Sequence, residues 1–178
     1  MTYSYISTNT PYQAKVAYFA GCMGHLTPGV LQAMELIFSK ANIDYTFIDK
    51  QGGICCGRPL LLSGNANVAS VLMEKNRAII ESSKAELLVT SCPICYKTFK
   101  EDYQLSIPVM HHTEYLHKLI QEGQLQPHAS ELKTVFHNPC ELGRGCNIYQ
   151  APDEVLKAVS HKLPTAYEGN KSLCCGGS

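Results

Sequence analysis

The stretch ELLVTSCPIC, residues 86–95, decides the fold of this chain. Its apolar run, residues 86–90, has the length of a buried strand. Cys92 and Cys95 follow this strand, and residues 95–103 are predicted to be helical. A strand that leads through a short turn into a helix is half of a βαβ unit. The stretch therefore predicts a parallel sheet with two cysteines at the carboxyl end of one strand.

The same succession of strand, cysteine and helix precedes this stretch twice. Cys22 follows the predicted strand KVAYFAG, residues 15–21. Cys55 and Cys56 lie in the glycine-rich loop QGGICCGRP after the predicted strand YTFI, residues 45–48. Further predicted elements are a short strand, PVMHH, and helices over residues 28–40, 66–83 and 113–122. Ligands of open parallel sheets bind outside the carboxyl ends of the strands, which is where these cysteines are expected.

Two of the predicted helices have recognisable ends, and their apolar spacing predicts a core. Thr27 is the expected N-cap before Pro28, and Gly123 is expected to end the helix over residues 113–122. The expected core residues are Val30, Met34, Ile37, Ile43, Tyr45, Phe47, Val68, Leu72 and Ile79.

The pattern starts again after residue 130. The segment TVFHNPC, residues 134–140, is a predicted strand that ends in a cysteine, residues 153–162 are a predicted helix, and LCCGG follows. The first half has 32 residues between Cys22 and its CC pair, and the second has 33 between Cys140 and its CC pair. This spacing indicates an internal repeat. We expect a tail or linker over residues 1–13, a first repeat over 14–123, and a second repeat over 131–178 that stops before a CxxC.

The expected fold is therefore α/β, with a parallel-sheet half of Rossmann-like or flavodoxin-like type and an incomplete second repeat packed against it.

Composition narrows the functional classes. The chain of 178 residues is 45% hydrophobic and carries 15 basic and 15 acidic residues, so no electrostatic footprint for nucleic acid is visible. The polar start MTYSYISTNTPYQ does not read as a signal peptide, and no run approaches the roughly 18 apolar residues of a membrane span. Nine cysteines in such a chain predict a cytoplasmic protein with metal or redox chemistry rather than structural disulfides.

The first repeat contains a five-cysteine motif, Cys22-x32-Cys55-Cys56-Gly57-x34-Cys92-x2-Cys95. Thiolates are the soft ligands that iron–sulfur clusters and zinc prefer. A multi-iron cluster suits adjacent cysteines better than a single tetrahedral ion does, because each thiolate can bind a different iron.

The backbone around these cysteines is suited to an anionic group. Gly52, Gly53 and Gly57 allow the chain to approach a cluster closely and to direct N–H groups at it. Cys92 and Cys95 lie at a predicted helix start, whose partial positive charge favours thiolates.

Several stretches together resemble a known family. CCGRPLLLSGN, LLVTSCPICYKTFKEDY, HHTEYLHKLIQEGQL, HNPCELGRG and CCGG look like the cysteine-rich CCG domain of the heterodisulfide reductase B subunit. The same domain occurs in the iron–sulfur subunits of anaerobic glycerol-3-phosphate dehydrogenase, glycolate oxidase and the lactate-utilisation system. In that family the motif normally occurs twice, and in heterodisulfide reductase each five-cysteine set holds a non-cubane 4Fe-4S cluster that reduces a disulfide.

The resemblance implies a ligand set for this chain. One cluster would be held by Cys22, Cys55, Cys56, Cys92 and Cys95. Three ligands of a second cluster would be Cys140, Cys174 and Cys175. Expected neighbours of these sites are Gly57, Arg58 and His137.

The chain also departs from the family pattern. The second motif lacks its final CxxC, and Glu141 stands where the family often has histidine. The ferredoxin-like cysteine runs of the dehydrogenase subunits are absent, and Cys146 has no assigned role. A fragment of a longer protein would explain the missing pieces.

The leading functional hypothesis is an iron–sulfur electron-transfer or disulfide-reducing domain of an oxidoreductase. Its expected partners are flavin-containing or ferredoxin-like subunits or a disulfide substrate, and such subunits could hold it peripherally at a membrane. The alternative from another class is a structural or interaction module that binds zinc through four of the same cysteines. A third state is a metal-free protein that has lost its cluster in air. Metal content separates the first two hypotheses.

Overall fold

The structure is a computed structural model that describes residues 16–176. A four-stranded parallel sheet lies at its centre, in the order β2-β1-β3-β4. Its strands are β1 (Val16–Phe19), β2 (Tyr45–Phe47), β3 (Leu87–Thr90) and β4 (Val109–His111). The expectation of an α/β fold with a parallel sheet is confirmed. The strand order is that of the first four strands of flavodoxin-like folds, in which the chain changes direction between β1 and β3.

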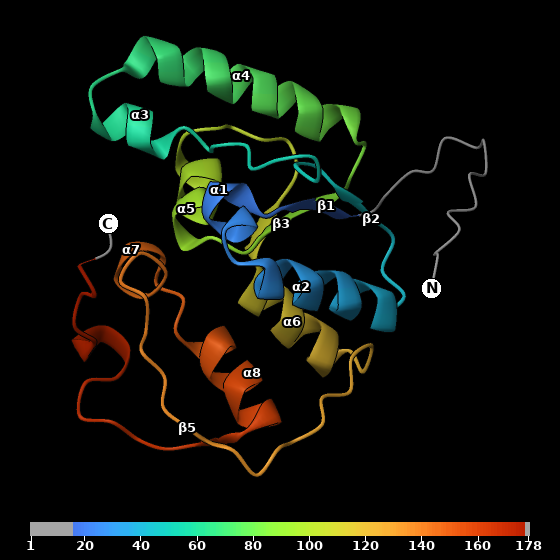
Figure 1. The fold of residues 1–178 in the computed structure, drawn as a ribbon, viewed down its shortest axis with the longest axis vertical. Helices are drawn as coiled ribbons and strands as arrows, with labels where there is room; N and C mark the ends of the chain where they lie inside the picture. Colours follow the sequence, from blue (N-terminus) through green and yellow to red (C-terminus); the bar gives the residue numbers. More distant parts are fainter. Residues whose placement is uncertain (1–15, 177–178) are drawn as a thin grey trace.

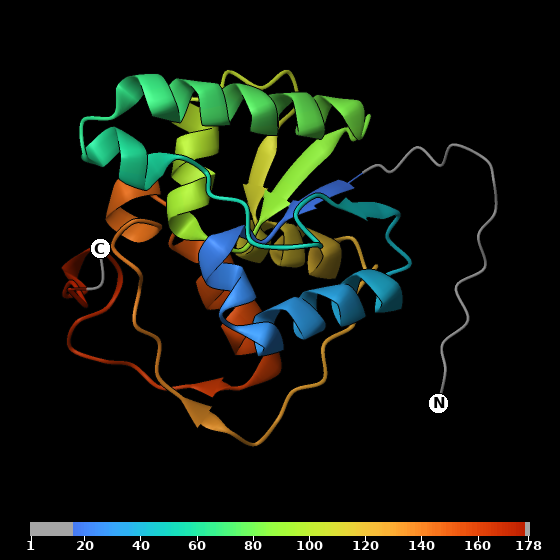
Figure 2. The same ribbon diagram turned by 45° about the horizontal axis from the view of Figure 1, so that its top comes forward.

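Helices cover both faces of this sheet (Figures 1 and 2). The helices α2 (Pro28–Lys40) and α6 (His112–Gln121) pack on one face, against Val16, Tyr18 and Val89. The other face, which includes Ala17, Phe19 and Leu88, lies against α4 (Ala66–Ser82) and α5 (Pro93–Glu101). Successive residues of β1 therefore enter opposite cores, which explains why this strand is apolar throughout.

The capping residues lie where the sequence placed them. Thr27 is the N-cap of α2 with Pro28 at its start, although the Thr27 hydroxyl donates backward to the carbonyl of Gly24 (3.0 Å). Gly123 has a φ of +70° just beyond α6.

Part of the expected core is wrong. Val30, Val68 and Ile79 are exposed, with Val68 58% accessible, whereas Met34 is buried as expected. The buried residues of α4 are Ala69, Asn76 and Ile80. Ala69 and Ile80 each lie one position beyond an expected core residue, Val68 and Ile79. The sequence misled because the buried face of α4 includes a polar side chain, Asn76, which has hydrogen-bond partners inside the molecule.

Two short helices in the first part of the chain were not expected, and both lie beside cysteines. The helix α1 (Gly21–His25) follows β1 directly and contains Cys22, and α3 (Arg58–Leu62) begins just after Cys56. β1 thus leads almost at once into a helical turn that carries Cys22, whereas a loop over residues 48–57, which carries Cys55 and Cys56, lies between β2 and α3.

The C-terminal part packs against the first part through helices and a small apolar cluster. Its elements are β5 (Lys133–Thr134), α7 (Gly143–Cys146), α8 (Gln150–Val159), β6 (His161–Lys162) and the 3₁₀ turn η1 (Gly169–Lys171). α8 lies along α6 (Figure 1). Leu142 and Ile148 pack with Tyr96 of α5, and the half-buried Cys146 adds to this cluster. Cys146 is therefore a packing residue between the two parts.

The expected element limits in this part need correction. The predicted strand over residues 134–140 is only Lys133–Thr134, which pairs in parallel with β6. Pro139 has no N–H, and the side chain and carbonyl of Asn138 bind Gly169 and Ser172 rather than a neighbouring strand. The predicted helix over 153–162 is Gln150–Val159, because Ser160 adopts an extended backbone and leads into β6.

Candidate functional site: a cysteine cluster at the sheet edge

Three strand ends bring five cysteines to the carboxyl edge of the sheet. Cys92 is the N-cap of α5 and Cys95 lies in its first turn. The thiol of Cys95 is in hydrogen-bonding contact with those of Cys56 and Cys92. Cys55 makes a similar contact with Cys22. Cysteines 33 residues apart (Cys22 and Cys55) and 39 residues apart (Cys56 and Cys95) are thus neighbours in the fold.

Two glycines make this approach sterically feasible. Gly21 has a φ of +77°, and a Cβ atom added there would lie 3.0 Å from the sulfur of Cys95. A Cβ at Gly53 would lie 2.9 Å from the Cα of Cys22. The loop before the CC pair and the turn after β1 therefore touch through backbone, which side chains would prevent.

A buried carboxylate fixes the turn that carries Cys22. Asp49, just after β2, accepts hydrogen bonds from the backbone N–H groups of Ala20 (3.0 Å) and Gly21 (2.8 Å). The Nε2 atom of His25 lies 3.3 Å from the same carboxylate. Asp49 thereby ties the end of β1 to the end of β2, a role that no local sequence pattern announces.

Asn76 of α4 and Tyr103, which follows α5, hold the CC pair. The amide of Asn76 donates to the carbonyl of Cys55 (2.9 Å) and to the Tyr103 hydroxyl (2.8 Å), and that hydroxyl donates to the carbonyl of Cys56 (2.9 Å). Each polar group in this buried chain has a partner, so the loop carbonyls are fixed at small cost in desolvation. Sequence reasoning missed both residues, and an asparagine within an apolar helical pattern was the only signal.

Backbone amides point at several of the sulfurs. The N–H of Gly57 donates to Cys55 Sγ (3.4 Å), and the N–H of Arg58 contacts the Cys56 thiol. At the start of α5, the N–H groups of Ile94 and Cys95 contact the Cys92 thiol. These donors stabilise thiolates and any anionic group bound to them.

The three thiols around α5 share protons unevenly. The hydrogen bond from Cys95 lowers the pKa of Cys56 to about 7 and that of Cys92 to about 6. The pKa of Cys95 is raised, because it lies buried between these two thiols. Burial raises the pKa of Cys55. Two members of the set are thus prepared to act as thiolates near neutral pH.

The second cysteine set lies in the C-terminal part and is more open. Cys140 Sγ and Cys174 Sγ are 3.9 Å apart, and Cys175 is exposed. The N–H of Gly176 donates to Cys174 Sγ (3.4 Å), which repeats the contact between Gly57 and Cys55 in the first set. This N–H and the contact with Cys140 lower the pKa of Cys174, and the pKa of Cys140 is raised by the same contact.

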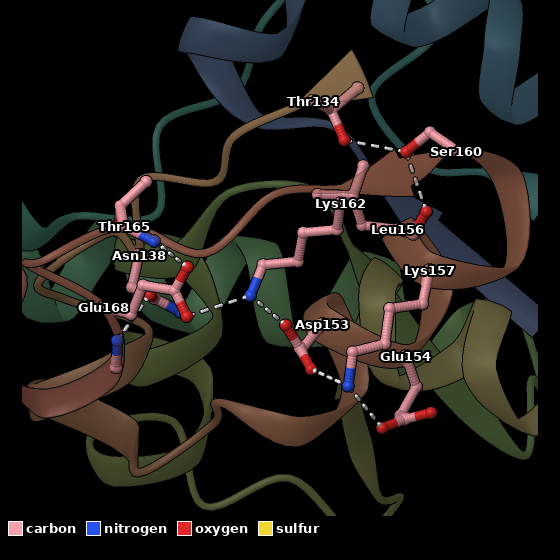
Figure 3. Close-up of polar contacts among 11 residues, drawn as sticks. Thr134, Asn138, Asp153, Glu154, Leu156, Lys157, Ser160, Lys162, Thr165 and Glu168 are labelled. Atoms are coloured by element: carbon pink, nitrogen blue, oxygen red, sulfur yellow. Dashed lines mark hydrogen bonds and ion pairs between the residues drawn. The ribbon is translucent and has the colours of Figure 1, made fainter. Parts of the chain in front are cut away.

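An ion-pair network supports the segment before the second CC pair (Figure 3). Lys162 reaches Asp153 of α8 (2.6 Å) and Glu168 (3.2 Å). Glu168 also accepts from the N–H of Thr165 (2.7 Å), and Asn138 accepts from the N–H of Gly169 (2.8 Å). Glu168 lies six residues before Cys174, the same spacing as between Asp49 and Cys55. In both halves, an acidic residue six positions before the CC pair anchors the loop that leads to that pair, but its hydrogen-bond and ion-pair partners differ.

The residues expected around the cysteines lie in different places. Gly57 is buried at the start of α3 with a φ of +93°. The side chain of Arg58 lies 3.8 Å from the carboxylate of Asp102, so only its backbone faces a thiol. His137 is exposed and donates from Nε2 to the carbonyl of Leu173 (2.8 Å), the residue before Cys174, so it lies beside the second set and not the first.

The five thiols of the first set suit a sulfur-ligated group. They are soft donors from three separate segments, with backbone N–H groups directed at them and two glycines keeping the space beside them free of Cβ atoms. Within residues 16–176, no group of three or more His, Cys, Asp or Glu side chains is arranged around the position of a single metal ion.

The fold and the cysteines together define a family. A family model, the CCG cysteine-rich domain, matches residues 16–100 and 134–178, and the chain belongs to this family. Its relatives include subunits of oxidoreductases and iron–sulfur proteins, as the resemblance had predicted. No solved structure matches the chain.

Three curated relatives illustrate this family. The D subunit of the dihydromethanophenazine:CoB–CoM heterodisulfide reductase of Methanosarcina acetivorans is 29% identical over 177 residues, which covers 92% of this chain and 43% of the relative. An uncharacterized iron-sulfur protein of Methanocaldococcus jannaschii is 29% identical over 163 residues (91% and 32%). The EtfAB:quinone oxidoreductase of Syntrophomonas wolfei is 27% identical over 150 residues (82% and 21%). The chain spans less than half the length of these relatives.

None of the helices in the described part of the chain is long and apolar enough to cross a membrane.

Proposed function

We propose that this chain holds a 4Fe-4S cluster, of the non-cubane CCG type, and acts as the electron-transfer or disulfide-reducing part of a larger oxidoreductase. The proposed ligands are Cys22, Cys55, Cys56, Cys92 and Cys95. The observation that carries the proposal is the contact of Cys95 with both Cys56 and Cys92, beside the Cys22 and Cys55 pair, at the carboxyl edge of a parallel sheet.

The chain's own residues have separable roles in this proposal. The thiols bind, Asp49 holds the turn of Cys22, and Asn76 with Tyr103 holds the CC loop. Backbone N–H groups of Gly57 and Arg58 offset negative charge on the sulfurs. A bound cluster would supply one-electron redox chemistry, whose potential depends on such hydrogen bonds and on solvent exposure.

We also propose a division of the chain into repeats and a set of partners. We propose a first repeat over residues 14–123 and a second over 131–178, with a preceding tail. The names of the relatives, a subunit of a heterodisulfide reductase and a quinone oxidoreductase, support partner subunits or a disulfide substrate. We propose further that the partner subunits carry flavin or ferredoxin-like centres and that the protein acts in the cytoplasm, at or near a membrane. The relative described above is the D subunit of a heterodisulfide reductase. Activity like that of the B subunit is therefore our proposal and is not given by that relative's name.

Anaerobic reconstitution followed by metal analysis tests the proposal. We expect about four irons and four sulfides per chain for one 4Fe-4S site, visible absorption, and a paramagnetic resonance signal in one redox state. Cys56→Ala and Cys92→Ala should abolish iron and sulfide together, whereas Cys146→Ala should retain both, because Cys146 packs outside the set.

A zinc result would overturn the proposal. About one zinc per chain without sulfide, lost in the same variants, would define a structural zinc module instead.

A further inference from the structure

The turn between β3 and α5 carries Cys92 and has polar partners on both neighbouring strands. On β1, the hydroxyl of Tyr18 is hydrogen-bonded to that of Ser91 (2.8 Å). On β4, the last residue, His111, pairs with Thr90 at the end of β3. His111 is only 2% exposed, and the backbone of Ser91 lies beside its ring. The carboxyl edge of the sheet thus places a buried imidazole next to the residue that precedes Cys92.

The hydrogen bonds of the His111 ring decide which nitrogen carries its proton. Nδ1 accepts from the backbone N–H of Thr113 (3.4 Å) and lies 2.8 Å from the hydroxyl of the same residue, so His111 caps α6. Glu114 completes the capping box by accepting from the backbone N–H of His111 (3.0 Å). Burial and the neighbouring His112 lower the pKa of His111 to about 3, so its ring is neutral near pH 7. A neutral ring that accepts at Nδ1 carries its proton on Nε2.

The Nε2–H group is therefore a buried donor beside the β3 turn. Within residues 16–176, this Nε2 atom has no partner of regular hydrogen-bond geometry. Against the effects of burial and His112, the backbone of Ser91 raises the pKa of His111. An acceptor has this effect, so the Ser91 carbonyl is the group that faces the ring. A buried donor without an acceptor is costly, which favours a hydrogen bond between this N–H and that carbonyl.

The packing of the ring keeps Nε2 in this direction. The ring centroid of His112 lies 4.3 Å from that of His111, and Tyr96 of α5 lies edge-on to the His111 ring at 6.1 Å. Rotation of the ring would also break its bond with Thr113 and uncap α6. His111 therefore has one orientation in which Nδ1 serves α6 and Nε2 faces the turn of Cys92.

From this arrangement we propose that His111 is a positioning residue of the first cysteine set: its Nε2–H group holds the carbonyl of Ser91 and thereby fixes the turn of Cys92. The N–H groups of Ile94 and Cys95, which contact the Cys92 thiol, lie in the first turn of α5, directly after this point. Their alignment with the Cys92 sulfur then depends on a residue of another strand. The effect on a bound cluster rests on the proposed function, whereas the hold on the turn exists in the metal-free protein as well.

Two substitutions separate the two nitrogens of His111. The side-chain oxygen of asparagine lies near the position of Nδ1 and is a good N-cap, so His111→Asn keeps the cap of α6 but removes the donor at Nε2. The longer glutamine side chain brings an amide N–H to the position of Nε2, so His111→Gln keeps a donor there but loses the cap. His128→Asn, at an exposed histidine, is the control.

Hydrogen exchange measures the turn in the metal-free protein. We expect the backbone N–H groups of residues 91–95 to exchange about fivefold faster in His111→Asn, the factor expected for the loss of one typical hydrogen bond. In His111→Gln these rates should stay close to those of the wild type, although the start of α6 should exchange faster. His128→Asn should match the wild type in both segments. Exchange in β1 and α2 shows that each variant is folded.

The reduction potential measures the same contact in the cluster-loaded protein. Hydrogen bonds to the sulfurs of an iron–sulfur site raise its potential, because they stabilise the more negative, reduced state. His111→Asn should therefore retain iron and sulfide but have a more negative midpoint potential, and His111→Gln should return the potential toward the wild-type value. A residue that only stabilises α6 would give the reverse order, because asparagine is the better cap.

The reverse order would overturn the inference. If His111→Gln is the impaired variant, His111 acts only as the N-cap of α6. Exchange of residues 91–95 at the wild-type rate in His111→Asn would likewise show that Nε2 does not hold the turn. Faster exchange with an unchanged potential would overturn the link to the cluster. If the wild-type protein binds no iron or sulfide, the proposed cluster function fails, and the exchange rates by themselves decide whether His111 positions the turn.

Discussion

At the scale of single residues, Cys95 is central to the first cysteine set. It is buried and contacts two other thiols, which raises its pKa, so in the metal-free protein Cys95 keeps its proton at pH values at which Cys56 and Cys92 lose theirs. Binding of a metal or cluster would displace that proton, which makes loading of the site dependent on pH. Loading should be favoured as pH rises, because ligation requires thiolates.

Replacing Cys95 tests this arrangement in the metal-free protein. Cys95→Ala removes the largest cause of the lowered pKa values at Cys56 and Cys92, so both should rise from about 7 and about 6 toward 9.0. Between these limits the variant should contain fewer thiolates than the wild type, as measured by ultraviolet absorbance during a pH titration. Cys146→Ala is the control, since its thiol does not contact this group. An unchanged low-pH titration in Cys95→Ala would show that another group lowers these values.

At the scale of elements, α4 positions the CC loop through Asn76 and the Tyr103 hydroxyl. The loop itself has no regular structure, so its carbonyls depend on these partners. This explains why a polar side chain occupies the buried face of α4 while Val68 faces solvent.

Removal of one hydroxyl measures this support. Tyr103→Phe leaves the Cys56 carbonyl and one amide hydrogen of Asn76 without partners, and should lower the free energy of unfolding by about 1 to 3 kcal/mol. Tyr167→Phe, at an exposed tyrosine, should change it little. Denaturant unfolding of the metal-free proteins gives both values. Equal effects of the two substitutions would mean that the buried hydroxyl does not support the loop.

At the scale of the whole molecule, the C-terminal part is held by α8 against α6 and by the cluster of Tyr96, Leu142 and Ile148. Lys97 of α5 also lies 3.9 Å from the carboxylate of Glu141. The two cysteine sets thus belong to one packed structure, and loosening this contact should affect the stability of both parts.

A substitution that creates a cavity in this contact tests whether the two parts are packed together. Leu142→Ala should lower the free energy of unfolding by about 2 to 5 kcal/mol, because the side chain is almost fully buried. Leu132→Ala, at an exposed position, should change it by less than about 0.5 kcal/mol. Unfolding followed by circular dichroism compares the two. A small effect of Leu142→Ala would indicate that the parts are not packed together in solution.

Much of the fold followed from local pattern. Apolar runs of strand length, each followed by cysteine, predicted β1, β2 and β3, and parallel pairing then places their carboxyl ends at one edge. The start of α2 followed from Thr27 and Pro28. The second half was less predictable, because residues 134–140 look like a strand but bind through Asn138 to a distant turn.

The sequence by itself determined which residues are near the strand ends, because strand and helix periods are local properties of the chain. Only the tertiary structure decided which face of α4 is buried, that Asp49, Asn76 and Tyr103 hold the cysteine loops, and that Cys140 meets Cys174. These contacts join residues 21 to 47 positions apart. Such contacts depend on how the elements pack in three dimensions, and no local pattern of side chains encodes that packing.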